Sequence, residues 1–205
     1  MKLVIIKYNA GNIQSVLYAL ERLGLKARVT DDVDEILQAD KVIFPGVGEA
    51  STAMNYLKQR NLDKLIANLQ QPVLGICLGL QLMCKHSEEN DTTCMGIFDE
   101  PVRKFVPPDS PGETELKRDV FKVPQIGWNN IYNLKTGLFK NVDEKSYCYF
   151  VHGYYASLGE HTIATTDYVQ PYSSALQRDN FYGVQFHPEK SALAGEQIIK
   201  NFLNL

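Results

Sequence analysis

The amino-acid sequence predicts an α/β fold: a mostly parallel β-sheet flanked by helices, with antiparallel strands added in the second half of the chain. In the first half, short apolar runs alternate with segments whose apolar residues recur at helical spacing. In the second half, short runs rich in tyrosine, threonine, phenylalanine and valine are separated by turn signals. A length of 205 residues suits one domain with a sizeable core, so we expect a single domain over residues 1–205.

The parallel part of the sheet is predicted from four apolar runs, at residues 3–6, 27–30, 42–45 and 73–76. Between the first two runs, apolar residues recur at helical spacing from Ile13 until Gly24 ends the helix. A short helix is expected over 33–37 and a longer one over 50–69. Alternating strands and helices give a parallel sheet, and ligands of such sheets collect at the carboxyl ends of the strands.

The second half of the chain predicts strands that join this sheet in antiparallel fashion. They are expected at 147–151, 162–165, 173–177 and 182–186. A last helix is expected to contain residues 198–203. The polar, proline-rich stretch at 107–123 is expected to form an inserted, exposed loop.

Composition and charge exclude several classes of protein. The net charge is −3 and no basic run stands out, so nucleic-acid binding is not expected. Apolar runs are too short to span a bilayer or to serve as a signal peptide, so we expect a cytoplasmic protein with no membrane contact. The four cysteines, at positions 77, 84, 94 and 148, lack CxxC spacing. We therefore expect free thiols, no metal site and no cofactor.

The sharpest local feature is Gly-Ile-Cys-Leu-Gly at 75–79, directly after an apolar strand. Flanking glycines allow a tight strand-to-helix turn that pushes a nucleophilic side chain outward. Cys77 would stand at a helix N-terminus, where unpaired amides and the helix dipole favour the reactive thiolate. The same amides can stabilise an oxyanion, which makes the N–H of Leu78 a candidate donor. Taken alone, the pattern fits a small buried cysteine between packing glycines equally well.

A cysteine nucleophile needs a base, and the base needs a group that orients it. His187 ends an apolar run, and Glu189 follows two residues later with a proline between them. His152 is the second candidate for the base, whereas His86 and His161 stand in polar surroundings and are expected at the surface. A His-x-Glu sequence is commonly a surface pair, but its occurrence together with the cysteine turn favours catalysis.

Pro-Gly-Val-Gly at 45–48 follows the third predicted strand, so it should open at the same sheet edge as Cys77. Glycines let backbone amides point into a site, so the N–H of Val47 is a candidate second oxyanion donor. By itself the motif is weak, because an ordinary strand-to-helix turn has the same composition. It is not a phosphate loop, since the lysine and Ser/Thr of that pattern are missing.

Together these motifs resemble the triad class (class I) of glutamine amidotransferases. The resemblance rests on Pro-Gly-Val-Gly at 45–48, Gly-Ile-Cys-Leu-Gly-Leu-Gln at 75–81 and Gly-Val-Gln-Phe-His-Pro-Glu at 183–189. It implies a flavodoxin-like sheet and a triad of Cys77, His187 and Glu189, with Val47 and Leu78 as oxyanion donors. The reaction implied is hydrolysis of glutamine to glutamate and ammonia through a thioester.

Further segments resemble one branch of this class, the glutaminase subunits of imidazole glycerol phosphate synthase in histidine biosynthesis. These segments lie at 8–12, 124–129, 149–152 and 189–191. Two residues depart from the branch: Gln125 stands where histidine is more common, and Gly153 stands where serine is more common. Without the serine hydroxyl, one contact with glutamine is expected to change at Gly153.

The resemblance also implies which residues hold glutamine. They are Gly48, Gln81, Glu89 and the backbone region of Gly153 and Tyr154. Gln81 has independent support, because it lies one helical turn after Cys77 and shares its helix face. For the carboxylate, Glu88 is as good a choice as Glu89 from the sequence alone.

Ammonia must reach an acceptor, and the motifs already occupy nearly the whole chain, so we expect a partner enzyme. The resemblance implies a heterodimer with a (β/α)₈-barrel cyclase subunit that joins ammonia to a phosphoribosyl-type intermediate. Its products would be imidazole glycerol phosphate and aminoimidazole carboxamide ribonucleotide. The residues expected near that interface are Asn12, Trp128, Asn129 and Lys190. The alternative for Trp128, the only tryptophan, is a place in the core.

Two other functions fit part of the pattern. A stand-alone Cys-His hydrolase, such as a γ-glutamyl peptidase, explains the cysteine turn and the histidine but leaves the segment around Trp128 unexplained. A non-catalytic binding module would keep the fold alone, and the complete Cys-His-Glu set argues against it.

Overall fold

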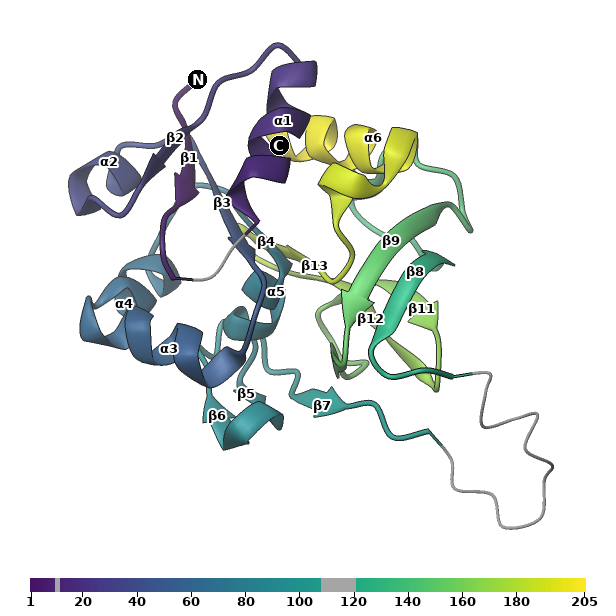
Figure 1. The fold of residues 1–205 in the computed structure, drawn as a ribbon. Helices are drawn as coiled ribbons and strands as arrows, with labels where there is room; N and C mark the ends of the chain where they lie inside the picture. The colour runs from purple at the N-terminus through teal and green to yellow at the C-terminus, as the bar shows by residue number, and fades with distance from the viewer. Residues whose placement is uncertain (10–11, 108–120) are drawn as a thin grey trace, which may run out of the picture.

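The computed structural model describes residues 1–9, 12–107 and 121–205. The loop predicted at 107–123 and the segment at 8–12 fall partly on 108–120 and 10–11, which lie outside the described residues. Figure 1 shows a central sheet with helices on both sides and a small two-stranded sheet next to it. Within the described ranges, no helix is long and apolar enough to cross a membrane.

The parallel part of the large sheet has the strand order β2-β1-β3-β4-β13. Its strands are β1 (Leu3–Ile6), β2 (Arg28–Thr30), β3 (Lys41–Gly46), β4 (Val73–Cys77) and β13 (Phe181–Val184). Every residue of β1, β3, β4 and β13 is buried, as expected for strands covered on both faces by helices. The mostly parallel α/β fold predicted from the sequence is confirmed.

The second part of the large sheet continues from β13 in the order β12-β10-β7-β5-β6, with β11 paired to β12. Its strands are β5 (His86–Ser87), β6 (Thr92–Thr93), β7 (Val102–Lys104), β10 (Tyr154–Ala156), β11 (Thr162–Asp167) and β12 (Pro171–Arg178). Most of these pairs are antiparallel, as predicted, whereas β5 and β7 are parallel.

Two of the predicted antiparallel strands are placed differently. The run predicted at 182–186 forms β13, which is antiparallel to β12 but parallel to β4. The run predicted at 147–151 forms β9 (Tyr147–His152), which among the described strands pairs with β8 (Gln125–Asn130) alone, in a separate two-stranded sheet. A run of residues reveals that it is extended, but its partner depends on tertiary packing, which the run itself does not encode.

Helices α1 and α6 cover one face of the parallel strands, and α2 to α5 cover the other (Figure 1). They are α1 (Ile13–Arg22), α2 (Val33–Leu37), α3 (Ala50–Gln59), α4 (Leu62–Ala67), α5 (Leu78–Met83) and α6 (Ala192–Leu203). Short 3₁₀ turns are η1 (Glu89–Asp91), η3 (Gly137–Phe139) and η4 (Pro188–Lys190). Side chains alternate along β1, so Leu3 and Ile5 join the α1–α6 core while Val4 and Ile6 join the other.

The single helix predicted over 50–69 is wrong, because the chain breaks it into α3 and α4. Asn61, between the two, has φ 56° in the left-handed region, which ends the first helix. Asparagine tolerates this conformation better than most residues. The apolar pattern runs through the break because Leu57 and Leu62 are both buried in the same core, so periodicity alone does not reveal two helices.

Candidate active site

Cys77 stands in a strained turn between β4 and α5. Its φ is 53° and its ψ is −109°, a conformation that few residues other than glycine adopt. The turn is tight because Gly79 touches the neighbouring strand: a Cβ at Gly79 would lie 1.9 Å from the carbonyl oxygen of Phe44. The tight strand-to-helix turn predicted at Cys77 is therefore present. Cys77 itself is only 6% exposed.

Strand register brings the three sequence motifs together around Cys77. Gly46 at the end of β3 lies opposite Cys77, and Val184 at the end of β13 lies opposite Ile76. The residues that follow these strand ends therefore converge at one sheet edge: Val47 from one neighbour, and the segment leading to His187 from the other. This is the carboxyl edge at which ligands of parallel sheets collect.

A cavity of ≈ 230 Å³ opens at this edge. It is lined by Val47, Gly48, Cys77, Leu78, Gln81, Glu89, Val151, His152, Gly153, Tyr154, His187 and Lys190. The candidate oxyanion donors and all five candidate glutamine-binding residues are in this set. Asn12, Trp128 and Asn129 are not.

His187 and Glu189 form a buried pair on the turn η4. Nδ1 of His187 lies 2.9 Å from Oε1 of Glu189, and both side chains are almost fully buried. Burial alone would lower the pKa of His187, but hydrogen bonds with Cys77 and Glu189 and their negative charge raise it to about 10. The sulfur and the carboxylate therefore favour the protonated form of the His187 ring.

His152, the rival base, lines the same cavity but is held differently. Its Nδ1 lies 2.7 Å from the carbonyl oxygen of Tyr154, and its Nε2 lies 3.3 Å from the hydroxyl of Tyr172. Burial lowers the pKa of His152 to about 4, so the ring is neutral. With both nitrogens occupied by other groups, His152 is poorly placed to take a proton from Cys77.

The other two histidines differ from each other. His86 pairs with the exposed Asp91 at 2.9 Å, as expected for a surface residue. His161 was expected at the surface too, but its side chain is only 14% exposed and its Nδ1 lies 3.0 Å from Oε2 of the buried Glu100. The polar neighbours of His161 in the sequence do not reveal its burial, because its partner Glu100 lies 61 residues away in the chain.

The geometry distinguishes Glu89 from Glu88. Glu89 lines the cavity, and its Oε2 accepts a hydrogen bond of 2.8 Å from the N–H of Ala50. Burial raises the pKa of Glu89. Glu88 points to β7 instead, where it accepts hydrogen bonds from the N–H of Lys104 at 2.7 Å and from Arg103 at 3.3 Å.

Two residues with clear contacts to the site were missed in the sequence. Gln185 is fully buried and its Nε2 lies 3.6 Å from the sulfur of Cys77. Ser191 donates a hydrogen bond of 2.6 Å to the carbonyl oxygen of His187 and accepts one of 3.0 Å from the N–H of Tyr149. Gln185 lies within the segment at 183–189 and Ser191 lies just after it. The spacing of an amide or a hydroxyl in the sequence does not by itself predict a contact with the site.

Trp128 is at the surface, so its alternative place in the core is wrong. It is 53% exposed on β8, and its ring packs edge-on against Tyr149 with centroids 5.9 Å apart. Nζ of Lys190 lies 5.9 Å from the centre of the same tyrosine ring.

The two asparagines expected near the partner interface have different surroundings. Asn129 donates a hydrogen bond of 2.8 Å to the carbonyl oxygen of Asp167. Asn12 precedes α1 and makes no capping hydrogen bond with its side chain.

The two departures from the resembled branch have different surroundings. Gln125 is buried, and its Oε1 accepts a hydrogen bond of 3.1 Å from the hydroxyl of Tyr172. A Cβ added at Gly153 would make only ordinary van der Waals contacts, the nearest with Val123 at 3.8 Å. A serine would therefore fit at position 153 without displacing its neighbours.

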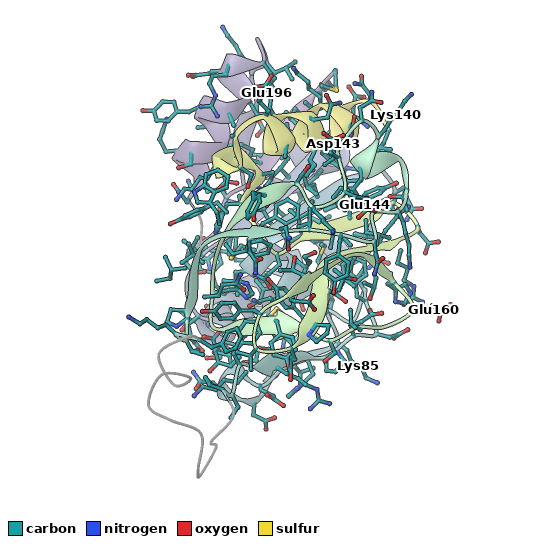
Figure 2. All side chains as sticks on the ribbon, turned by 90° about the vertical axis from the view of Figure 1, so that its right-hand side faces the viewer. Lys85, Lys140, Asp143, Glu144, Glu160 and Glu196 are labelled. Carbon is teal, nitrogen blue, oxygen red and sulfur yellow. The ribbon has the colours of Figure 1, made fainter. Side chains whose placement is uncertain are left out.

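Other charged groups lie away from the cavity. Figure 2 shows that Lys85, Lys140, Asp143, Glu144, Glu160 and Glu196 project from the outer surface, and none of them lines the cavity. Among the described residues, no group of three or more His, Cys, Asp or Glu side chains could hold a metal ion. All four cysteines are buried free thiols.

Comparisons with known proteins give one consistent result for the sequence. The family model described as glutamine amidotransferase class-I matches residues 4–205. The imidazole glycerol phosphate synthase subunit HisH of Bacteroides fragilis (strain YCH46) is 55% identical over 205 residues, covering 100% of both chains. The subunit of the same name from Bacteroides thetaiotaomicron is 53% identical, again over 100% of both chains.

Solved structures agree on the fold. PurLQS from Thermotoga maritima matches 99% of this chain and 97% of its own, with a TM-score of 0.68. Because the two sequences are 16% identical, this likeness speaks for the fold alone.

Proposed function

This chain belongs to the class-I glutamine amidotransferases, as a glutamine amidotransferase subunit of imidazole glycerol phosphate synthase in histidine biosynthesis, and on that premise we propose that Cys77, His187 and Glu189 form its catalytic triad. The observation that carries the proposal is the buried 2.9 Å contact between Nδ1 of His187 and Glu189 on the turn that meets Cys77. A histidine held in this way matches the base of a cysteine nucleophile.

In the first half-reaction, the sulfur of Cys77 attacks the carboxamide carbon of glutamine. Negative charge then moves to the carbonyl oxygen, where the N–H groups of Val47 and Leu78 stabilise it. His187 gives its Nε2 proton to the amide nitrogen, the C–N bond breaks, and ammonia leaves behind a glutamyl thioester on Cys77. Glu189 orients the imidazole and stabilises its charged form throughout.

In the second half-reaction, water attacks the thioester carbon and gives a proton to His187. A second oxyanion forms in the same place, the C–S bond breaks, and glutamate leaves. The sulfur returns to its starting state paired with the protonated His187. The two half-reactions together convert one glutamine and one water into glutamate and ammonia.

Glutamine is held by the residues that line the cavity around Cys77. Glu89 is the carboxylate best placed for the α-ammonium group of glutamine, because one of its oxygens is already fixed by the N–H of Ala50. Gly48, Gln81 and the backbone of Gly153 and Tyr154 complete the pocket. Charge recognition by a partly buried carboxylate gives preference for an amino acid over a simple amide.

The partner proposed is a (β/α)₈-barrel cyclase subunit that uses the ammonia to form imidazole glycerol phosphate and aminoimidazole carboxamide ribonucleotide. Support comes from the β8–β9 ribbon (residues 125–130 and 147–152), which leaves Ile126, Trp128 and Tyr147 exposed. Large exposed aromatic and aliphatic side chains are typical of interface cores. Lys190 joins this ribbon to the cavity by its contact with Tyr149. Asn12 and Asn129 are proposed at the same interface.

The proposal is tested with Cys77→Ala in complex with the cyclase partner. Product formation from glutamine should be abolished, because no nucleophile remains, while product formation from added ammonia should stay at the wild-type rate. The ammonia-dependent rate is the control for folding and assembly. Glutamine-dependent turnover by Cys77→Ala would disprove the mechanism. Full glutaminase activity of the chain alone, with no binding to the cyclase, would favour a stand-alone hydrolase instead.

A further inference from the structure

Gln185 lies beside the nucleophile because of strand pairing. Val184 at the end of β13 is in register with Ile76, so the next residue along each strand, Gln185 and Cys77, are neighbours. The N–H of Gln185 donates a hydrogen bond of 2.9 Å to the carbonyl oxygen of Ser174, which fixes its backbone. Its side chain is 0% exposed. A buried primary amide needs partners for its two N–H groups and its oxygen.

The contacts of Gln185 are with Cys77 on one side and Gln81 on the other. Nε2 of Gln185 lies 3.6 Å from the sulfur of Cys77. Oε1 of Gln185 accepts a hydrogen bond of 2.9 Å from Nε2 of Gln81. These contacts form a row from Gln81, a candidate substrate-binding residue, to the nucleophile.

Hydrogen bonding settles which way each amide points. Nε2 of Gln81 lies 2.9 Å from the carbonyl oxygen of Tyr154 as well as 2.9 Å from Gln185. Of the two polar atoms of the Gln81 amide, only the nitrogen can donate to the carbonyl oxygen of Tyr154, so this nitrogen also faces Gln185. The atom of Gln185 that accepts its hydrogen bond is therefore the oxygen. The nitrogen of Gln185 is therefore the atom that faces the sulfur, as a donor.

A donor in this position favours the thiolate form of Cys77. A hydrogen bond to the charged form of a group stabilises that form relative to the neutral one. His187 supplies a proton donor and positive charge to the same sulfur. The neutral amide adds a second, fixed donor that is in place for the attacking thiolate and again for the thiolate released when the C–S bond breaks.

We propose that Gln185 is a further catalytic residue of this site, which donates a hydrogen bond to the sulfur of Cys77 and links that sulfur to Gln81. The inference rests on the proposed role of Cys77 as the nucleophile. No hydrogen bond from the described residues occupies Oε1 of Gln81, which leaves this acceptor for an N–H of the substrate. Substrate that binds Gln81 is then connected to the sulfur of Cys77 through the side-chain amides of Gln81 and Gln185.

The test uses Gln185→Glu and Gln185→Met. Gln185→Glu keeps the size of the side chain, and because a carboxyl at this fully buried position is expected to stay protonated, it keeps both an acceptor for Gln81 and a donor for the sulfur. Gln185→Met removes both polar atoms without adding charge. Gln125→Met is the matched control, because it removes another buried glutamine that makes its contact with Tyr172.

The measurement is the rate at which iodoacetamide alkylates Cys77 as a function of pH, followed on the Cys77 peptide by mass spectrometry. Loss of one hydrogen bond to a charged group should move the pH midpoint of alkylation upward by about one to two units in Gln185→Met. Gln185→Glu should stay closer to the wild-type midpoint than Gln185→Met, because a protonated carboxyl still donates to the sulfur. Gln125→Met should keep the wild-type midpoint.

Glutamine-dependent turnover with the cyclase partner gives the second readout. Near neutral pH it should fall about 10- to 100-fold in Gln185→Met and recover as the pH rises. A wild-type midpoint and pH profile in Gln185→Met would overturn the inference, while loss of turnover in Cys77→Ala would leave the triad standing. Retained turnover in Cys77→Ala would instead refute the triad itself, so the two failures are distinguishable.

Discussion

The two walls of the cavity around Cys77 hold their polar groups in opposite ways. On the wall made by β13 and η4, His187 is paired with a carboxylate and its pKa is raised. On the facing wall, made by β9 and β10, His152 is paired with a carbonyl oxygen and a tyrosine hydroxyl and its pKa is lowered. Burial lowers the pKa of both rings, but only His187 has negatively charged partners that more than offset this effect.

The difference assigns separate tasks to the walls. In the proposed mechanism, the charged wall carries the groups that exchange protons with Cys77 and its leaving group. The neutral wall continues into the β8–β9 ribbon, whose outer side chains are exposed near the site. The cavity thus has one wall with charged groups and one uncharged wall that leads to an exposed aromatic surface. This arrangement is suited to passing ammonia to a partner.

The comparison is tested most strongly by removing each histidine in turn. His187→Ala should lower glutamine-dependent turnover by roughly 10³-fold or more, because both half-reactions lose their acid and base. His152→Ala should have a clearly smaller effect, since its nitrogens serve other partners. Steady-state assays of both variants with the cyclase partner measure this, and ammonia-dependent turnover is the control. The reverse order of effects would exchange the roles of the two walls.

The neutral state of His152 predicts how stability changes in mild acid. Burial lowers its pKa in the folded protein to about 4 from the ordinary value of 6.5. The unfolded chain then binds a proton that the folded protein rejects, so this contribution is complete above pH 6.5 and is lost as the pH falls toward about 4. For a fully buried group the loss amounts to roughly 3 kcal/mol.

Urea unfolding of the wild type and of His152→Gln, at several pH values from neutral to about 4, checks this expectation. The wild type should lose more stability than the variant over that range, because glutamine does not titrate. Parallel curves for the two proteins would show that folding does not lower the pKa of His152, contrary to this expectation.

The ribbon at the far end of the neutral wall predicts a binding effect. Trp128→Ala should weaken association with the cyclase partner by about 30-fold, the typical effect of truncating a central interface tryptophan. Titration calorimetry or fluorescence anisotropy measures the affinity. Leu37→Ala is the control, because Leu37 is 54% exposed on α2, at the opposite end of the sheet from the ribbon. Equal affinities for Trp128→Ala and the wild type would remove Trp128 from the interface.

The smallest expected effect concerns Gly153 on the neutral wall. Serine fits there, since the nearest atom to an added Cβ is 3.8 Å away. Gly153→Ser should lower the KM for glutamine by about 2- to 10-fold through one added hydrogen bond, with kcat little changed. Gly153→Ala fills the same space without the hydroxyl and should keep the wild-type KM. If serine and alanine act alike, position 153 contributes no polar contact.

Much of this picture follows from sequence because the site is built from strand ends. The segments containing Val47 and Cys77 each follow a buried apolar run, and parallel strands place such ends at one edge. Glu189 is close enough to His187 in sequence for their contact to be expected. Spacing therefore predicts the triad that is proposed here, and the mostly parallel fold that is confirmed.

Other features depend on tertiary contacts that spacing does not encode. The position of β13 beside β4 decides that Gln185 meets Cys77, yet the run itself suits any strand. The helix break at Asn61 is a single left-handed residue inside an unbroken apolar pattern. The burial of His161 depends on Glu100, which lies 61 residues away in the chain.

In the proposed mechanism, Cys77 carries the glutamyl group between the two half-reactions. The most direct test is to quench the complex with acid during turnover of isotope-labelled glutamine and to locate the label by peptide mass spectrometry. The mechanism predicts a labelled glutamyl group on the Cys77 peptide, with none on the peptides of Cys84, Cys94 or Cys148. Label on another residue, or turnover with no label on Cys77 at any quench time, would contradict it.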